Sequence, residues 1–264
     1  AGCCYPASCE ANPKPHAVIE YIYDMTINDA VYIAHELGHL IADDYIREAG
    51  FTYRDRRLHM AEAQAFFTQH VLYDYLATYP NAELRQAAHN HFVGEITRSL
   101  YSLPVSIGAL KAESAALSGQ SDDIIRTSYS TTMQTWLGEN WSAYKKAQWL
   151  SDHITDEEMR DKWGIRYLHQ HPMASIIVAG LFLQANQADP QQRQRIISSL
   201  FGAEGPKNIA DVFRDSGIDN EQSLKLLARD SIKYIASPLM GLQNPAPVVA
   251  VSTVTCGAEM HYDM

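Results

Sequence analysis

The sequence is short of basic residues and has no long apolar run, and each lack excludes a class of protein. Lysine and arginine number 21 against 31 aspartates and glutamates, so the 264-residue chain has a formal net charge of −10 at pH 7. This balance argues against nucleic acid as a partner, because a nucleic-acid-binding protein normally presents a basic face. No apolar run approaches the roughly 20 residues of a transmembrane helix, and the first residues lack the pattern of a signal peptide. We therefore expect no membrane partner and, by default, a cytoplasmic protein.

Cysteines are few and unevenly placed. Cys3, Cys4 and Cys9 are crowded at the start, and Cys256 lies near the end. A chain of this length can bury a full core without disulfides, and no second cysteine pair with zinc-finger spacing follows the first group. We expect reduced thiols. Because the chain begins with Ala1 instead of Met, we also expect a processed product or a part of a longer protein.

One motif points to a specific chemistry, namely the run His35-Glu36-Leu37-Gly38-His39. In a helix, residues four apart lie on the same face, so His35 and His39 present two imidazoles to one point. Two imidazoles can occupy two corners of a tetrahedral Zn²⁺ site, and the adjacent Glu36 is placed to take a proton from the water that the metal activates. The motif therefore predicts half of a zinc site.

The residues around the motif predict a helix over 26–50 and a strand before it. Thr26, with Asp29 three residues later, has the pattern of a capping box, apolar residues recur at helical spacing, and Gly50 is a typical stop. Residues 16–24 are rich in β-branched and aromatic types, which favours a strand. Such a strand beside a metal helix can bind an extended substrate by main-chain hydrogen bonds, and it can equally be a plain core strand.

A zinc site needs a third protein ligand, and a second helical pattern over 58–76 offers two candidates, His59 and Glu62. A glutamate in a first helical turn is often solvated and favoured by the helix dipole. The alanine- and phenylalanine-rich surroundings indicate instead a buried helix, where an unpaired carboxylate would be costly. We expect Glu62 to be the ligand, with His59 as the alternative. A metzincin is excluded, because Ala42 and Tyr45 stand where that class has Gly and His.

These segments resemble the M3 zinc metallopeptidases, and among them the oligopeptidase F branch. The resemblance rests on the lead from Asp24 into the motif, on Glu62 somewhat over twenty residues later, and on the Asp74-Tyr75 pair near the end of that helix. It implies a mainly α fold with a small β-sheet, forming a single zincin-like (gluzincin) catalytic domain over 1–264. It also implies one Zn²⁺ per chain and hydrolysis of peptide bonds in oligopeptides or exposed protein segments. Family members are longer, so the chain would be a catalytic part or a compact relative.

The stretch 163–172 is similar to the family's Arg-x-x-His segment. By that resemblance His169 would donate a hydrogen bond to the tetrahedral oxyanion, and Tyr167 is the nearest phenol. The chain departs from the family further on, because Met173 and Ala174 lie in the region where the family has tyrosines. The alternative is that His169 is a loop histidine before a buried helix.

Taken together, these residues predict a zinc metallopeptidase that acts on peptide or protein substrates. Two other classes stay open. A ferritin-like di-iron protein would use two Glu-x-x-His pairs on separate helices, and only Gln86-x-x-His89 comes near to a second pair. A binding or regulatory zinc module with the peptidase fold but without activity would agree with the missing tyrosines.

Overall fold

Helices make up most of the protein, which confirms the prediction of a mainly α fold. The computed structural model describes residues 2–5, 18–21, 26–51, 58–156 and 164–236. Within these ranges, none of the helices combines the length and the apolar character needed to cross a membrane. In chain order the elements are β1 (Gly2–Tyr5), β2 (Val18–Tyr21), α1 (Ile27–Glu48), α2 (Leu58–Ala77), α3 (Ala82–Leu117), α4 (Asp122–Leu137), the 3₁₀ helix η2 (Glu139–Ala143), α5 (Lys145–His153), α7 (Gly164–Gln187), α8 (Pro190–Phe201), α9 (Ile209–Asp215) and α10 (Glu221–Ala236).

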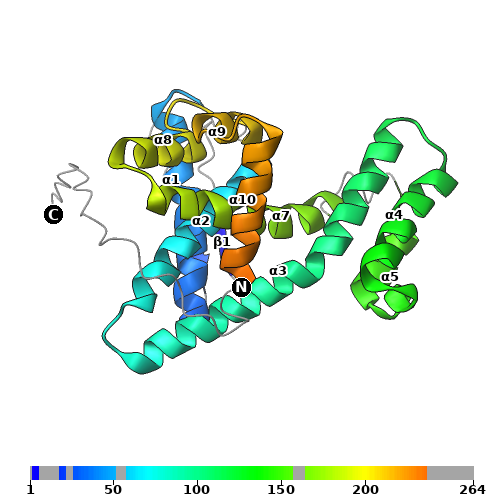
Figure 1. Cartoon of the computed structure of the whole chain (residues 1–264), viewed down its shortest axis with the longest axis horizontal. Coiled ribbons are helices and arrows are strands. Elements are labelled where there is room, and N and C mark those ends of the chain that lie inside the picture. The colour runs from blue at the N-terminus through cyan, green and yellow to red at the C-terminus, as the bar shows by residue number, and fades with distance from the viewer. Residues whose placement is uncertain (1, 6–17, 22–25, 52–57, 157–163, 237–264) are drawn as a thin grey trace.

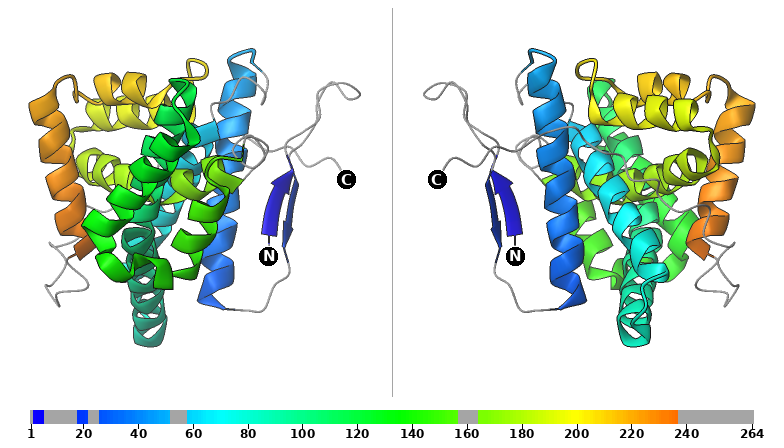
Figure 2. Two further views of the ribbon diagram at one scale, coloured as in Figure 1. Left: turned by 90° about the vertical axis from the view of Figure 1, so that its right-hand side faces the viewer. Right: turned by 90° about the vertical axis from the view of Figure 1, so that its left-hand side faces the viewer.

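The two described strands form an antiparallel hairpin that lies alongside α1 (Figure 2). Their register pairs Gly2 with Tyr21 and Tyr5 with Val18. Strand β2 falls inside the stretch 16–24, for which the sequence favours a strand.

Helix α1 begins at the predicted capping box. The Thr26 N–H donates to Asp29 Oδ2 at 2.7 Å, and the Asp29 N–H donates to Thr26 Oγ1 at 3.4 Å. The helix ends at Glu48, and Gly50 follows with φ 84°. A left-handed residue just after a helix is a common way to end it, and glycine adopts that conformation without a steric penalty. Both predicted ends of this helix are therefore confirmed to within two residues.

Helices α1 and α2 pack unusually closely at Gly38. A Cβ atom at this position would lie 2.6 Å from Ala65 Cα and 2.8 Å from the Gln64 carbonyl oxygen, both in the backbone of α2. Only glycine permits this approach without a shift of one helix. The Gln64 side chain in turn donates to the Leu200 carbonyl at 2.8 Å, which ties α2 to α8. Helix α1, which contains His35 and His39, is thus held directly against the helix that contains Glu62.

The main core lies where α2 meets α7 and α8. Phe67 of α2 contacts Phe182 of α7 and Phe201 of α8, with ring centroids 5.6 and 6.0 Å apart and interplanar angles that are close to edge-on. A second apolar cluster lies outside this body, between the later half of α3, α4 and α5, and contains Tyr129 and Leu150. In Figure 1 the later half of α3 leads away from the body to α4 and α5, which we call the arm.

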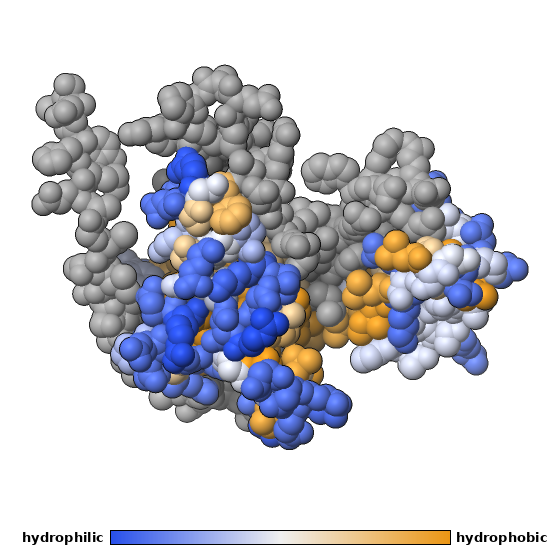
Figure 3. Space-filling view, turned by 90° about the horizontal axis from the view of Figure 1, so that it is seen from above, coloured by the Kyte–Doolittle hydropathy of each residue, from blue (hydrophilic) through white to orange (hydrophobic). Residues whose placement is uncertain are grey.

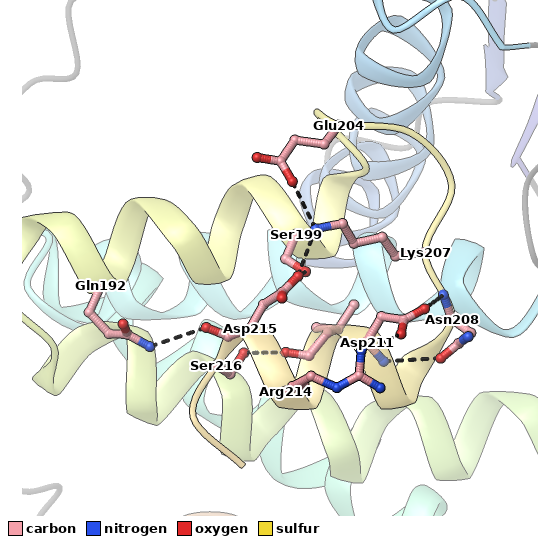
Figure 4. A network of polar contacts seen from close by, with 10 residues as sticks. Gln192, Ser199, Glu204, Lys207, Asn208, Asp211, Arg214, Asp215 and Ser216 are labelled. Carbon is pink, nitrogen blue, oxygen red and sulfur yellow. Dashed lines mark hydrogen bonds and ion pairs between the residues drawn. The ribbon is translucent and has the colours of Figure 1, made fainter. Parts of the chain in front are cut away.

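A polar network holds the segment after α8 in place (Figure 4). Asp215 Oδ2 accepts hydrogen bonds from Ser199 Oγ at 2.5 Å and from Lys207 Nζ at 2.7 Å, and Lys207 also pairs with Glu204 at 3.1 Å. Burial alone would raise the pKa of Asp215, but the hydrogen bonds from Lys207 and Ser199 outweigh it and lower the pKa.

In the view from above, hydrophilic residues cover much of the body, and a band of hydrophobic residues lies between the body and the arm (Figure 3).

Candidate metal centre

Two helices bring three predicted metal ligands together. His35 and His39 come from α1 and Glu62 from α2, and one nitrogen or oxygen of each lies within 4.8 Å of the others. His35 Nε2 lies 3.4 Å from Glu62 Oε2. The three side chains therefore form a cluster that can hold a metal ion.

The local packing explains how the two imidazoles are oriented. The rings of His35 and His39 are 4.9 Å apart between centroids and nearly perpendicular, at 89°. His35 also packs edge-on against Phe66 of α2, at 5.4 Å and 82°. Aromatic rings favour this edge-to-face arrangement, so Phe66 restricts the rotation of His35. The His35 ring, whose Nε2 lies 3.4 Å from Glu62 Oε2, is thus restricted by the same helix that supplies Glu62.

The donor set fits a divalent metal ion. Two imidazole nitrogens and one carboxylate oxygen suit zinc, and also suit iron or other first-row metals. Ligand atoms at the corners of a tetrahedral zinc site with bonds of about 2.0–2.1 Å lie about 3.3 Å apart, close to the 3.4 Å between His35 and Glu62. Glu62 is only 7% exposed, and a buried charge is unfavourable unless it is compensated. A bound cation would offset the negative charge of this carboxylate.

The cluster is not equally buried on all sides. His35 and Glu62 are buried, whereas His39 is half-buried. Catalytic zinc sites keep one position open for water or substrate, while structural sites are closed by four protein ligands. Three protein ligands with one of them partly exposed agree with an open site.

Glu36 lies beside the cluster and is not part of it. It is next to His35 in the chain and is buried, at 8% exposure. Successive residues of a helix point about 100° apart, from 3.6 residues per turn, so Glu36 and His35 leave α1 in different directions. Within the described ranges, no other group of three or more His, Cys, Asp or Glu side chains is placed to share a metal ion. Gln86 and His89, the nearest approach to a second Glu-x-x-His pair, lie on α3 and are not part of the cluster.

Three other candidates have side chains outside the described residues. The backbone of His59 lies in the first turn of α2, and Tyr167 and His169 lie in the first two turns of α7. The segment around His169 is therefore helical, which corrects the alternative of a loop histidine. Its proline, Pro172, lies inside the same helix. Helix α7 packs against α2, which places the backbone of this segment on a direct neighbour of the helix that contains Glu62.

The sequence motif did not reveal two residues on which the cluster depends. Gly38 permits the close contact of α1 with α2, and Phe66 orients His35. The sequence does contain a signal for Phe66: it lies four residues after Glu62, and residues four apart share a helix face, so Phe66 is expected beside the cluster. The signal for Gly38 is that it lies in the middle of a predicted helix, where glycine is normally unfavourable by roughly 0.5–1 kcal/mol relative to alanine. A glycine in such a position indicates a close approach of another backbone.

Comparison of the chain with models of protein families, with curated proteins and with solved structures found no match. The M3 family therefore stays a prediction from the motif and its surroundings. The function is therefore inferred from the chemistry of the cluster itself.

Proposed function

We propose that this chain is a zinc-dependent peptidase in which His35, His39 and Glu62 hold one Zn²⁺. The single observation that supports this most directly is the convergence of a His-His-Glu donor set at the contact of α1 and α2. When bound, zinc would supply the Lewis acidity that makes a water molecule more acidic and polarises a substrate carbonyl. The substrates would be oligopeptides or exposed segments of proteins, as for the M3 family that the motif resembles.

Glu36 would move the proton in this reaction. A carboxylate oxygen of Glu36 would accept a proton from the attacking water and then deliver it to the nitrogen of the leaving amine. Two properties support this role: Glu36 is adjacent to a ligand without belonging to the cluster, and it is shielded from bulk solvent. A shielded site loses fewer protons to bulk water during the transfer.

His169, and Tyr167 as a second candidate, would stabilise the oxyanion. A donor of this kind forms its hydrogen bond as negative charge develops on the carbonyl oxygen, so it accelerates the reaction without holding the metal. The contact between α7 and α2 agrees with this role. We expect His169→Ala to lower kcat by about 10²–10³ with an unchanged KM and an unchanged metal content.

In this proposal the fold is a zincin-like (gluzincin) domain over 1–264, with the β1–β2 hairpin as its small sheet. The hairpin lies beside α1. A two-stranded sheet leaves unpaired main-chain groups along its edges, and an extended peptide can add there as a further strand. Substrate binding along this hairpin would bring a peptide past the metal helix. A cytoplasmic location is part of the same proposal.

The test combines metal analysis with peptide cleavage. Zinc content is measured by mass spectrometry, and turnover is measured with a quenched peptide library. Glu36→Gln should keep the metal and lower turnover by about 10²–10⁴, because the amide has the shape of the carboxylate but cannot accept the proton. Glu62→Ala should lose the metal, whereas His59→Ala should keep it. The matched control is Glu83→Gln, the same chemical change at an exposed position of α3.

Three results would contradict this scheme. Parental turnover in Glu36→Gln would remove the proposed proton transfer. Metal loss in His59→Ala but not in Glu62→Ala would assign the third ligand to His59. One zinc per chain in the parent without cleavage of any peptide would favour the inactive binding module instead.

A further inference from the structure

A cavity lies at the other end of α2 from the metal cluster. It has a volume of about 230 Å³ and is lined by residues of α2, α3, α7 and α10. Its residue Asp74 is twelve positions after Glu62 on the same helix, or about 18 Å along the axis at a rise of about 1.5 Å per residue. The cavity is therefore separate from the metal cluster.

Four aromatic residues line this cavity, namely Tyr73, Phe92, Phe182 and Tyr234. Their ring centroids are 4.9 Å apart for Tyr73 and Phe92, and 5.8 Å apart for Phe92 and Tyr234. The buried ring of His70 supports three of them, since it stacks on Phe182 at 5.5 Å and contacts Phe92 and Tyr234 at 5.8 and 5.7 Å. Rings packed on both sides in this way form a preformed apolar wall.

The carboxylate of Asp74 lies in the wall of this largely apolar cavity. Asp74 lines the cavity and is half-buried, and burial raises its pKa. Among the described residues, its carboxylate has no hydrogen bond and no ion pair. Arg85 also lines the cavity, but its Nη1 donates to the carbonyls of Tyr79 and Pro80 at 2.6 and 3.0 Å. The guanidinium thus holds the turn between α2 and α3.

We propose that this cavity binds an organic ammonium ion that bears one aromatic or compact apolar group. Asp74 would pair with the ammonium, and the aromatic rings would contact both the apolar group and the cation. A carboxylate without a partner in a partly desolvated position is unfavourable, and a cationic ligand removes that penalty. Aromatic faces also attract cations.

The size of the cavity limits the ligand. Sites for drug-sized molecules measure about 300–1,000 Å³, so 230 Å³ is suited to a smaller molecule. At roughly 30 Å³ per water-sized group, the cavity takes on the order of eight non-hydrogen atoms. 2-Phenylethylammonium is close to this size, and Asp74 would repel an anion of the same size.

The experiment compares three probes of nearly equal shape on the full chain at pH 7.5, by calorimetry and by ligand-observed NMR. The probes are 2-phenylethylammonium, neutral 2-phenylethanol and anionic phenylacetate. We expect the ammonium to bind at least tenfold more tightly than the alcohol, and phenylacetate not to bind. Asp74→Asn should remove the preference for the ammonium, whereas Asp122→Asn, the same change at an exposed position of α4, should keep it. Thermal unfolding checks that each variant is folded.

Two further measurements make the outcome decisive. Ala77 lines the cavity from an exposed position, so Ala77→Leu should fill the cavity and abolish ammonium binding with an unchanged unfolding midpoint, even if Asp74→Asn does not fold. All titrations are repeated with a chelator, because an amine can also ligate a metal ion. Ammonium binding that disappears with the chelator, that persists in Asp74→Asn or Ala77→Leu, or that is no tighter than the binding of 2-phenylethanol would overturn the proposal.

Discussion

The replacement of Gly38 by alanine tests directly how α1 and α2 build the metal cluster. The added Cβ would lie 2.6 Å from Ala65 Cα and 2.8 Å from both the Gln64 carbonyl oxygen and Thr68 Oγ1. Carbon atoms in contact are normally about 3.5–4.0 Å apart. The Thr68 hydroxyl can rotate away, but the two backbone atoms can move only with the whole helix. The helices must therefore separate by about 1 Å at this point.

The magnitude of the effect on metal binding follows from this shift. Ligand positions in metal sites tolerate deviations of about 0.2 Å, and Glu62 lies one turn from Ala65 on the displaced helix. We expect the zinc affinity of Gly38→Ala to fall by at least about tenfold, which is the lower end of what loss of ligand orientation causes. The effect on stability is smaller. Overpacking is unfavourable by about 1–3 kcal/mol, and alanine gains back up to about 1 kcal/mol of helix propensity, so the net loss is about 0–2 kcal/mol.

The matched control is Gly94→Ala on α3. Gly94 is also inside a helix, but a Cβ there would meet nothing within 4 Å. This variant should gain about 0.5–1 kcal/mol of stability and bind zinc as the parent does. Urea unfolding gives the stability of both variants, and competition with a chromophoric chelator gives the zinc affinity. If Gly38→Ala binds zinc like the parent and gains stability like Gly94→Ala, the close contact of the helices does not position Glu62.

Three further predictions concern stability and are measured by urea unfolding. Burial lowers the pKa of His70 from 6.5 to about 4. Between these two pH values His70 is protonated in the unfolded chain but stays neutral in the folded protein. The free energy of unfolding therefore decreases by about 3 kcal/mol as the pH falls from 6.5 towards 4. His70→Phe should lack that share of the pH dependence, and an unchanged profile would contradict it. Lys207→Met should lose about 1 kcal/mol, and less at high salt, because it removes an ion pair with Asp215; an equal loss at both salt concentrations would point to packing instead. Tyr129→Phe should lose about 1–2 kcal/mol, because its buried hydroxyl donates to the Ala147 carbonyl at 3.1 Å; zinc binding should not change, since this contact lies in the arm.

The parts of the fold that could be predicted from the sequence depend on neighbours along the chain. The capping box of Thr26 and Asp29 involves residues three apart, and it forms as expected. The range of α2 also agrees with the prediction to within one residue. Such signals are local, because a helix is defined by caps and periodicity within a few turns.

The parts that could not be predicted depend on contacts between distant segments. Helix α3 runs through Pro104 for 36 residues, although proline normally interrupts a helix. The later half of this helix is held by the separate apolar cluster with α4 and α5, which no local pattern reveals. The cavity beside Asp74 is similar, because its walls combine α2 and α3 with α7 and α10, which lie far along the chain from them.

The geometry of the metal cluster depends both on spacing within one helix and on a contact between two helices. The spacing of His35 and His39 brings their rings together within one helix, whatever surrounds it. The position of Glu62 depends instead on how closely a second helix approaches. That approach needs a glycine on α1 and a small residue on α2, where Ala65 is completely buried beside Gly38. In the sequence, the alanines around Glu62 indicate only that this helix is buried. In the structure they have a more specific effect, because a larger residue at Ala65 would separate the helices and take the carboxylate away from the two imidazoles.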